Sequence, residues 1–568
     1  MPGDPIAAVS DRLHLADKSL TMPPARRDEA SSTVAPGRPA AYPPFDVDRR
    51  AAGGDPLQAL SRLVSFLRGV LSHISPFARS RTNSRIPVEL GGMKVFIRKA
   101  PIGSAAVDRR SVLSCAGAAV LAAAGLGSGH AAESQRPNIL FILADDLGFA
   151  DLGCYGRRGI ATPHIDALAA QGVRLTQAYA NSAVCSASRT AIITGRYQDR
   201  FLVGLEEPIA SDEDGERLQL PEGHPTLPSM FKAAGYHTSL VGKWHLAGGR
   251  AGPTKAGYDY FYGFYPGATD YFRRPTDKEA IPGYPGAALF EGDRVIQPKG
   301  YLTDLLASAA IRRIESTPAS EPFLVSLHFN APHWPWEGPT DELKSARLKK
   351  LRDADGGNEA VFGAMVESMD RAVGEVLAAL ERTGRAENTI VVFTSDNGGE
   401  RFSDTWPLTG MKGELLEGGI RVPGIVRWPA RIKGGQTLGQ VMIGMDWMPT
   451  LLGAASLQSD PKFLPDGEDL MQVLAGTARP HPRKLFWRYK AFEQAAVRSG
   501  DWKYLRIGGH EYLFNLAQDE RERANRQEAE PDIFDRLRAE YDAWNAQMLP
   551  YPLASNSDSP KGRMADRY

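Results

Sequence analysis

The sequence predicts an α/β protein in which helices flank a central sheet, followed by a smaller antiparallel sheet with a helix. Short apolar runs alternate with segments of helical periodicity from Arg136 onward, as in sheets covered by helices. After about Leu452 the pattern changes, because short strand-like runs precede a charged helix at residues 532–548. We therefore expect a main domain at residues 133–452, a C-terminal subdomain at 453–552 and a tail at 553–568.

The elements of the main domain follow from the apolar runs and from the residues that bound them. The run at 138–143 is continuously apolar, as in a strand buried on both faces. Thr162 and Pro163 open a helix as its cap and first turn, and Gly172 ends it. The other expected elements are helices at 226–234 and 358–381 and strands at 237–241, 322–329, 389–394, 495–498, 502–506 and 512–514.

Composition and charge narrow the class of protein. The chain has 568 residues, 42% of them hydrophobic, which is enough to bury a large core in more than one domain. Lys plus Arg and Asp plus Glu both number 67, and this balance argues against nucleic acid or an anionic membrane surface as the main partner. The cysteines, Cys115, Cys154 and Cys185, show no zinc-site spacing and no disulfide framework. The sequence leaves open whether Cys154 and Cys185 form a disulfide.

The N-terminal region has the composition of a disordered extension followed by an export signal. Residues 1–92 are rich in Pro, Ala, Arg and Ser, which predicts disorder apart from one short amphipathic helix at 57–71. In residues 93–132, the pair Arg109-Arg110 precedes an Ala/Gly-rich apolar run and small residues, which resembles a twin-arginine signal. Export by this route predicts a periplasmic or secreted protein.

A secretory signal belongs at the start of a chain, whereas this one begins near residue 93. The basic residues after Met93 make a suitable beginning, so we hypothesise that translation starts at Met93 and that residues 1–92 are not translated. The mature protein would begin near Ala132 or Glu133 and would not be stably inserted in a membrane.

Two acidic clusters each follow an apolar strand. Asp145-Asp146 comes after the first expected strand, and Asp396-Asn397 comes after the strand that ends at Thr394. In open α/β sheets, ligands collect at the carboxyl ends of the strands. Three carboxylates packed together without a cation would repel one another. An all-oxygen site of this kind suits a hard divalent ion such as calcium or magnesium.

Cationic residues stand near the ends of the same set of strands. Lys243 and His245 follow one expected strand and would project to the same side if the chain stays extended. His333 follows another strand, and Lys412 lies in a glycine-rich loop after the second acidic cluster. Such groups can stabilise an anion in a transition state.

The stretch Cys185-Ser186-Ala187-Ser188-Arg189 resembles the signature of the type I sulfatases, in which the cysteine is oxidised after translation to formylglycine. Further motifs resemble that family in their order from Arg136 to about Met548. They are Asp145-Asp146, Gly242-Lys243-Trp244-His245, Pro332-His333-Trp334-Pro335, Ser395-Asp396-Asn397-Gly398, Gly410-Met411-Lys412 and the run at 417–423. The resemblance implies an alkaline-phosphatase-like fold with a mixed central sheet, and hydrolysis of sulfate esters.

The resemblance also implies a metal and a nucleophile. One calcium ion would be held by four residues and touched by oxidised Cys185. The four are Asp145, Asp146, Asp396 and Asn397. The nucleophile would be the hydrate of the formylglycine made from Cys185, at the expected start of a helix whose N–H groups favour anions.

Five further residues receive roles from the same resemblance. Arg189 would hold the formylglycine hydrate, and His245 would hydrogen-bond it and assist the release of sulfate. Lys243 and Lys412 would bind the sulfate oxygens. His333 would protonate the leaving oxygen as a general acid.

Two other functions stay open on the sequence. A phosphomonoester or phosphonate hydrolase of the same superfamily would share the fold, although such relatives tend to use two zinc ions with several histidines. A non-catalytic sulfatase-like binding protein would keep the fold without the modification. The commoner family motif has proline where this chain has Ala187, and sulfatases with alanine there also look modifiable by a formylglycine-generating or equivalent enzyme.

The substrate is expected to be a sulfated small molecule or a glycan. The aromatic-rich segment at 263–274, together with Trp334 and Trp336, suits the walls of a site for a sugar ring or an aryl group. These residues are equally compatible with a role in core packing.

Overall fold

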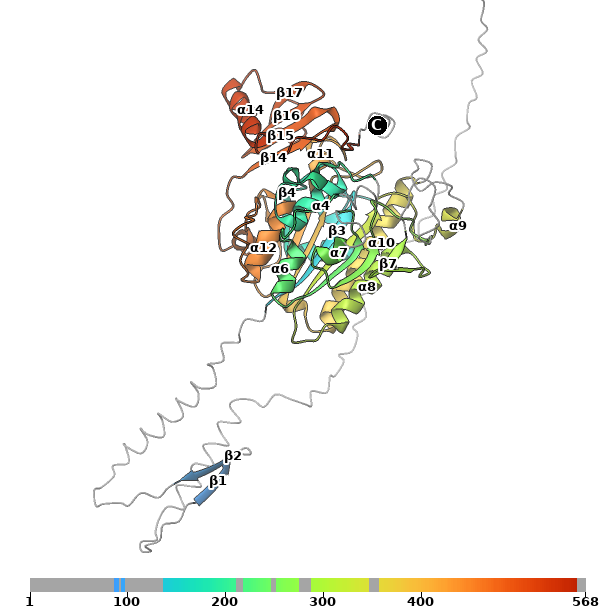
Figure 1. The fold of residues 1–568 in the computed structure, drawn as a ribbon, viewed down its shortest axis with the longest axis vertical. Helices are drawn as coiled ribbons and strands as arrows, with labels where there is room; N and C mark the ends of the chain where they lie inside the picture. The colour runs from blue at the N-terminus through green and yellow to red at the C-terminus, as the bar shows by residue number, and fades with distance from the viewer. Residues whose placement is uncertain are drawn as a thin grey trace, which may run out of the picture. The chain divides into compact units, whose positions relative to one another are not determined.

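The computed structural model, drawn in Figure 1, describes residues 86–90, 93–97, 136–210, 218–246, 252–274, 288–346 and 357–558. The chain falls into two units, divided after Leu121. In the first unit, β1 (Ile86–Leu90) pairs antiparallel with β2 (Met93–Ile97). β1 lies in the stretch for which the sequence predicts disorder, and the two glycines that follow it in the sequence favour a hairpin turn. The helix predicted at 57–71 and the predicted signal beyond β2 lie outside the described residues.

A mixed sheet, 11-stranded within the described residues, forms the centre of the second unit. Its middle is parallel, and the order of neighbouring strands is β10, β3, β9, β5, β6. Their bounds are β10 (Thr389–Ser395), β3 (Asn138–Asp145), β9 (Phe323–Pro332), β5 (His237–Lys243) and β6 (Tyr260–Phe264). The strands predicted at 138–143, 237–241, 322–329 and 389–394 are all present in this parallel part.

Antiparallel pairs flank this parallel part and make the sheet mixed. Beyond β10 the sheet continues antiparallel through β11 (Arg421–Arg427) and β4 (Val173–Tyr179). β12 (Gln436–Leu438) and β13 (Met442–Ile443) then pair parallel with β4. Beyond β6 come β7 (Leu289–Glu291) and β8 (Arg294–Ile296), both antiparallel. The predicted α/β class and its mixed sheet are confirmed.

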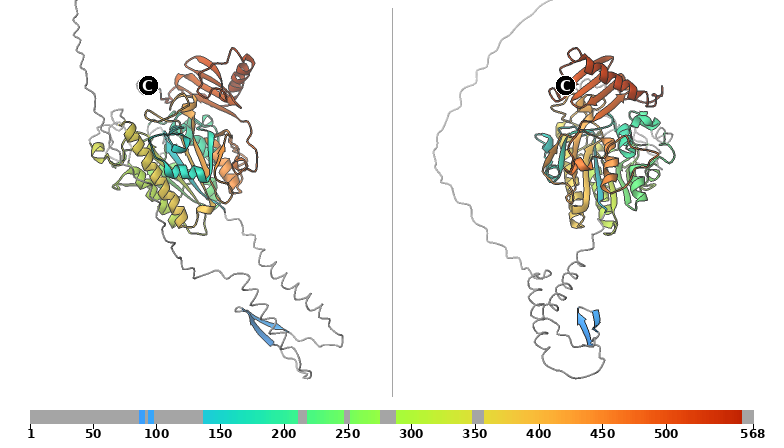
Figure 2. Two further views of the ribbon diagram at one scale, coloured as in Figure 1. Left: turned by 180° about the vertical axis from the view of Figure 1, so that it is seen from behind. Right: turned by 90° about the vertical axis from the view of Figure 1, so that its left-hand side faces the viewer.

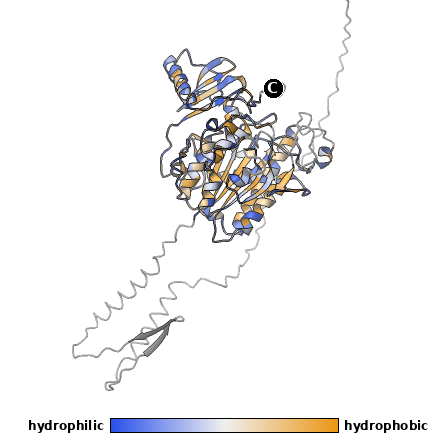
Figure 3. Cartoon of the chain, in the orientation of Figure 1, coloured by the Kyte–Doolittle hydropathy of each residue, from blue (hydrophilic) through white to orange (hydrophobic). Residues whose placement is uncertain are grey.

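Helices cover both faces of the sheet. Alternate residues of β3 point to opposite sides, so its apolar side chains need a packing partner on each face. Leu140 and Ile142 share a buried cluster with α3 (Pro163–Gln171), α8 (Leu302–Ser316) and α10 (Glu359–Arg382). Phe141 and Leu143 share another cluster with α6 (Leu227–Ala233), α12 (Trp447–Ala454) and α13 (Met471–Leu474). The rear view in Figure 2 brings the yellow helix α10 to the front. Figure 3 shows the strands between the two layers largely in orange, the colour of hydrophobic residues.

Two predicted helix starts differ in how they are capped. At α6, the Thr226 hydroxyl accepts from the Ser229 backbone N–H, and the Ser229 hydroxyl accepts from the Thr226 N–H. At α3, Thr162 occupies the capping position as predicted, but its hydroxyl accepts from Gly153 N–H instead. Thr162 therefore ties α3 to the preceding loop and does not cap the helix with its side chain.

The C-terminal subdomain is an antiparallel sheet with a helix. The strands follow in the order β14 (Lys484–Tyr489), β15 (Gln494–Ser499), β16 (Trp502–Ile507) and β17 (His510–Asn515), and α14 (Pro531–Asn545) packs on them. Its buried cluster also contains Ala187 and Ala191 of α4 (Cys185–Thr194), so the subdomain shares a core with the main domain. Ser557, in the predicted tail, forms a backbone bridge with Glu207 of the main domain.

The remaining elements are short. They are the helices α7 (Gly252–Lys255), α9 (Glu342–Ser345) and α11 (Glu417–Ile420) and the 3-10 turns η1 (Gly153–Tyr155), η2 (Gln198–Arg200), η3 (Leu202–Leu205), η5 (Ala386–Asn388), η6 (Gly444–Asp446) and η7 (Ala491–Glu493). Within the described ranges, no helix has both the length and the apolar character needed to cross a bilayer.

Candidate active site

Neighbouring parallel strands deliver the candidate residues to one edge of the sheet. Asp396 follows β10, Asp145 ends β3, His333 follows β9, and Lys243 ends β5. Because these strands are adjacent and parallel, their carboxyl ends meet at the same edge. α4 adds Cys185, its first residue, to this group.

The acidic cluster is fully buried and closely packed. Asp146 N–H lies 3.4 Å from Asp396 Oδ1, and Asn397 Nδ2 donates to Asp146 Oδ1 at 2.7 Å. Successive residues of an extended strand point to opposite sides. Asp146 has φ 61°, a left-handed conformation that aspartate tolerates, and this turn brings its carboxylate to the same site as that of Asp145.

Two oxygens of this cluster are ready to bind a cation. One ligand atom from each of Asp145, Asp146, Cys185 and His333 lies within 4.8 Å of the others. Asp145 Oδ1 and Asn397 Oδ1 are buried and accept no hydrogen bond from any described residue. Leaving a buried acceptor without a partner costs about 1–3 kcal/mol. A hard divalent cation would satisfy both oxygens, so the residues fit such an ion.

The pKa values of the two neighbouring carboxylates, Asp145 and Asp146, are shifted in opposite directions. Burial and the adjacent Asp396 raise the pKa of Asp145 to about 7. Burial also disfavours the charge on Asp146, but Lys412, then His333 and Lys243, outweigh it and hold its pKa below the usual range. Asp145 is thus the carboxylate whose ionised form most needs a further positive charge.

Both candidate lysines reach this cluster. Lys243, fully buried, forms an ion pair with Asp145 Oδ2. Lys412 Nζ lies 2.7 Å from Asp146 Oδ2 and 3.7 Å from Glu400 Oε2. Two ammonium groups thus lie beside one buried cluster of carboxylates.

Cys185 lies in the middle of the group. It is buried, and its Sγ is 4.0 Å from Asp146 Oδ1. Burial raises the pKa of the thiol well above its ordinary value, although Lys243 and Lys412 oppose this. The unmodified thiol is therefore protonated and a weak nucleophile. Within the described chain, Cys154 and Cys185 are both free, which removes the disulfide between them.

Arg189 lies one turn beyond Cys185 on the same face of α4. Its Nε donates to Asp396 Oδ2 at 2.8 Å, and its Nη1 donates to the Lys243 carbonyl at 3.2 Å. The structure thus shows Arg189 joining the ends of β10 and β5. Its buried Nη2 makes no hydrogen bond within the described residues and remains available as a donor.

His245 reaches the site by a turn and not by an extended strand. Its φ is 48° and β5 ends at Lys243, so the condition of an extended chain from Lys243 to His245 is not met. Nε2 lies 3.0 Å from the Ile209 carbonyl, an acceptor, so Nε2 carries the proton. Burial and Lys243 lower the pKa of His245 well below its ordinary value. The ring is therefore neutral, with Nδ1 as an acceptor.

His333 shows the reverse arrangement. Its Nδ1 donates to the Trp334 carbonyl at 2.6 Å, which leaves Nε2 facing Asp146 Oδ2 at 3.6 Å. Burial lowers the pKa of His333 well below its ordinary value, Lys412 and Lys243 act in the same direction, and Asp146 opposes them. The ring is therefore neutral, with the proton on Nδ1 and with Nε2 as an acceptor.

Two further residues support the site. Sequence reasoning missed His328 and placed Tyr271 only among the candidate substrate walls at 263–274. His328, buried in β9, has Nδ1 3.4 Å from Arg189 Nη1. The same Nδ1 is 3.3 Å from the Lys243 carbonyl. Burial and Arg189 lower the pKa of His328 well below its ordinary value, so the ring is neutral. Tyr271, 0% exposed, donates its hydroxyl to the His333 carbonyl at 3.0 Å. The only signal for His328 was its place near the end of a predicted strand.

The candidate substrate walls are mostly core. Tyr271 is fully buried, and Trp336 is 6% exposed and packs on the core under α10. Trp334 is partly buried, and its ring lies 4.5 Å from the His333 ring. Of the two readings of these aromatics, core packing holds for Tyr271 and Trp336.

Known proteins resemble this chain in sequence and in fold. A family model described as Sulfatase matches residues 137–457. Mouse arylsulfatase J is 34% identical over 351 residues, which cover 61% of this chain and 56% of that protein. Rat steryl-sulfatase is 32% identical over 437 residues, 62% of this chain and 73% of that protein. This chain thus spans little more than half the length of arylsulfatase J and about three quarters of steryl-sulfatase.

The solved structure of Ps i-CgsB in complex with k-i-k-neocarrahexaose has a TM-score of 0.66 to this chain. It is 27% identical, and the match covers 75% of this chain and 96% of that one. The family match includes the strand ends that carry Asp145 and Asp396, the start of α4 at Cys185, and Lys412. On this match, and on the identity with steryl-sulfatase, the chain belongs to the sulfatase family of sulfuric ester hydrolases.

Proposed function

We propose that this sulfatase acts through a formylglycine made from Cys185, with one calcium ion held by Asp145, Asp146, Asp396 and Asn397. One observation carries the proposal. Cys185 begins a helix inside a buried cluster whose ligand atoms lie within 4.8 Å of one another, beside two lysines. A plain thiol with a raised pKa would be a poor nucleophile there, which favours its conversion.

The proposed groups divide the work with the side chains around them. A hydrated formylglycine supplies an oxygen nucleophile, and calcium supplies positive charge that acidifies this hydroxyl and neutralises the sulfate. Lys243 and Lys412 bind the sulfate oxygens and stabilise the charge that develops in the transition state. The N–H groups at the start of α4 add to the same anion site.

Two histidines handle protons in this proposal. A sulfate ester between the lysines brings negative charge, which raises the pKa of His333 and loads its Nε2 with a proton. His333 then gives that proton to the leaving oxygen. His245, whose Nδ1 is an acceptor, takes a hydrogen bond from a hydroxyl at position 185 and helps to release sulfate.

The donor set favours sulfate esters over phosphate esters. In the described chain, the metal-binding cluster contains carboxylates, a cysteine and one histidine, whereas two-zinc sites are rich in histidine. We therefore expect 4-nitrophenyl sulfate to be hydrolysed with a much higher kcat/KM than 4-nitrophenyl phosphate. The two esters share a leaving group, so the ratio reports the transferred group alone. A ratio in favour of phosphate would reverse the proposal.

For the natural substrate we propose a sulfated carbohydrate, with aryl sulfates as artificial substrates. Ps i-CgsB, which shares 27% identity, was solved with k-i-k-neocarrahexaose. The half-buried Trp334, whose ring is tilted by 40° against that of His333 at 4.5 Å, offers an apolar surface next to the proposed acid. A panel of sulfated glycans tests this choice. Release of sulfate from at least one is expected, and a panel left intact alongside active aryl-sulfate turnover would overturn it.

We also propose that the protein is exported, to the periplasm or beyond, after meeting a formylglycine-generating or equivalent enzyme. The support is the Arg109-Arg110 signal, since the twin-arginine route carries proteins that are already folded. Fractionation of cells expressing the full chain, with Arg109→Lys/Arg110→Lys as the comparison, should find activity outside the cytoplasm only for the unmutated signal.

The role of His333 predicts an effect that depends on the leaving group. His333→Gln should slow hydrolysis of a sugar sulfate about 10²- to 10⁴-fold, because that leaving oxygen needs a proton. Hydrolysis of 4-nitrophenyl sulfate should fall far less, because its leaving group is stable as an anion. The measurement is kcat/KM across esters of graded leaving-group pKa.

A matched control exists in His224, which is also buried and whose Nδ1 also bonds the carbonyl of the next residue. His224→Gln should not change the dependence on the leaving group. Equal loss for all esters in His333→Gln would contradict the role as general acid.

A further inference from the structure

The loop that carries Lys412, residues 409–417 (the lysine loop), is irregular. Gly410 has φ 92° and Gly413 has φ 87°, conformations that favour glycine. Residues 409–416 belong to no helix or strand, and Glu417 begins α11. The main domain holds the part next to Lys412 through two backbone bonds. Lys412 N–H donates to Gly399 O, and Gly413 N–H donates to Ala183 O, both at 2.9 Å.

The C-terminal subdomain holds the same part of the loop through Gln494. This residue begins β15 and is 2% exposed. Its Nε2 donates to the Gly413 carbonyl at 2.9 Å, and its Oε1 accepts from Leu415 N–H at 2.8 Å. One amide thus bonds both neighbours of Glu414, and one of these neighbours, Gly413, directly follows Lys412.

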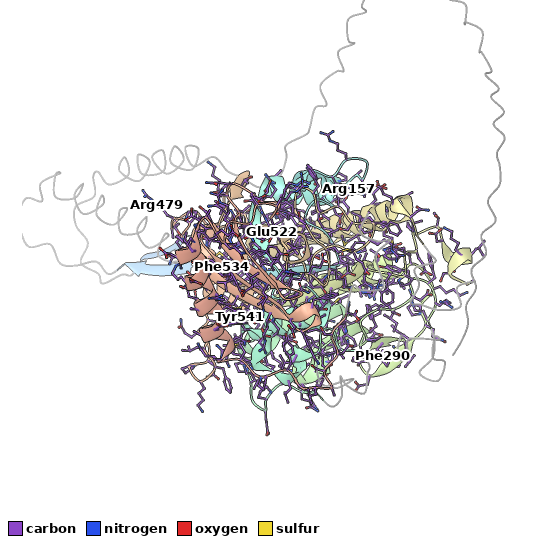
Figure 4. All side chains as sticks on the ribbon, turned by 90° about the horizontal axis from the view of Figure 1, so that it is seen from above. Arg157, Phe290, Arg479, Glu522, Phe534 and Tyr541 are labelled. Atoms are coloured by element: carbon purple, nitrogen blue, oxygen red, sulfur yellow. The ribbon has the colours of Figure 1, made fainter. Side chains whose placement is uncertain are left out.

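Other contacts attach the ends of the lysine loop to the same subdomain. The Thr409 hydroxyl donates to the Arg521 carbonyl at 2.6 Å. Glu417 N–H donates to Glu522 Oε2 at 2.6 Å, and Lys503 Nζ lies 2.9 Å from Glu417 Oε1. Figure 4 labels Glu522 in the C-terminal subdomain, together with Phe534 and Tyr541 of α14. These contacts fix the ends, whereas Gln494 fixes the residues next to Lys412.

We propose that Gln494 is a positioning residue that sets the place of Lys412, so that the C-terminal subdomain completes the sulfate-binding site. The inference rests on the proposed role of Lys412. A lysine ammonium is a point charge on a flexible stem, so its position depends on the backbone that carries it. Without the amide, the Gly413 carbonyl and the buried Leu415 N–H lose their partner, and the loop must move to satisfy them.

The test compares Gln494→Met with Gln440→Met, both nearly isosteric. Gln440 is also buried, donates to the Val441 and His481 carbonyls and accepts from His481 N–H, but bonds no residue of the lysine loop. Gln494→Met should lower kcat/KM for a sulfate ester about 10-fold or more and weaken inhibition by inorganic sulfate to a similar degree. A tenfold loss corresponds to about 1.4 kcal/mol of binding free energy. Gln440→Met should stay within about twofold of the parent even if both variants lose similar thermal stability.

A double-mutant cycle separates positioning from general damage. If Gln494 acts through Lys412, Gln494→Met should add little to the loss already caused by Lys412→Ala. Full multiplication of the two losses, or an equal loss in Gln440→Met, would overturn the inference. Should Gln494→Met fail to fold, Gln494→Glu keeps the acceptor for Leu415 and is expected to show the same pattern.

Amide hydrogen exchange tests the positioning role of Gln494 without an activity assay. Gln494→Met should speed amide exchange in the lysine loop, at Leu415 above all, and Gln440→Met should not. A parent protein that hydrolyses no sulfate ester would refute the proposed function alone. Unchanged exchange in the lysine loop of Gln494→Met would refute the positioning role alone.

Discussion

Cys185→Ala is expected to abolish sulfate-ester turnover, with kcat falling by about 10⁴- to 10⁶-fold, as when a covalent nucleophile is removed. The substitution deletes the atom from which the nucleophile is made. It removes one buried heavy atom at the start of α4, so the cost in folding free energy should stay near 1 kcal/mol. Cys185→Ser should be nearly as inactive, because a serine oxygen lacks the second hydroxyl that releases sulfate. Turnover of 4-nitrophenyl sulfate and thermal unfolding measure the two effects.

Cys154 supplies the matched control. It is a free, partly buried thiol next to Asp166 and outside the acidic cluster, so Cys154→Ala should keep full activity. The mass of the peptide containing residue 185, from protein made with a formylglycine-generating enzyme, should show the aldehyde or its hydrate. Full activity with an unmodified thiol would contradict the proposed nucleophile. An unmodified thiol in an inactive protein would indicate that Ala187 prevents modification by that enzyme. The experiment would then be repeated with the other type of modifying enzyme.

Much of the site was readable from the sequence because each group follows an apolar strand. Asp145 and Asp396 are each separated by one residue from the apolar runs at 138–143 and 389–394, which the sequence predicts to be strands, and the ends of parallel strands converge. The sequence could not supply the order of the strands. That β10, β3, β9 and β5 are neighbours depends on crossovers through α8 and α10, and this adjacency packs the side chains within reach of one cation.

Other features had no local signal. The left-handed turn at His245 breaks the extended run that its spacing from Lys243 predicts. His328 sits in a buried strand, where a histidine looks like any core residue. Gln494 meets Gly413 across 81 residues of sequence, and only the packing of β15 against the main domain brings them together. Long-range contacts of this kind follow from tertiary structure and not from patterns along the chain.

Calcium should stabilise the wild-type protein, and its removal should abolish turnover. Asp145 Oδ1 and Asn397 Oδ1 are buried acceptors without a hydrogen bond among the described residues, and Asp145 and Asp396 repel each other. A bound divalent cation relieves both costs. At a calcium concentration about 100-fold above the dissociation constant, the added stability is about 2.7 kcal/mol, which raises the Tm by a few °C. Thermal unfolding with calcium, with magnesium and with a chelator measures the shift and shows which ion gives it.

Asp145→Asn tests whether the effect of calcium on Tm arises from an ion bound at this cluster. The variant also leaves Lys243 without its ion pair, so its stability in chelator should differ from that of the wild type. The informative quantity is therefore the change in Tm on adding calcium, which should vanish in Asp145→Asn. Asp151 is an equally buried carboxylate that accepts from Gly148 and Asp404 N–H groups and lies outside the cluster. Asp151→Asn should keep the calcium shift even if its Tm falls. If neither chelator nor calcium changes the Tm or the activity of the wild-type protein, the proposed calcium site is wrong. Lys243 and Lys412 alone would then neutralise the charge of the carboxylates.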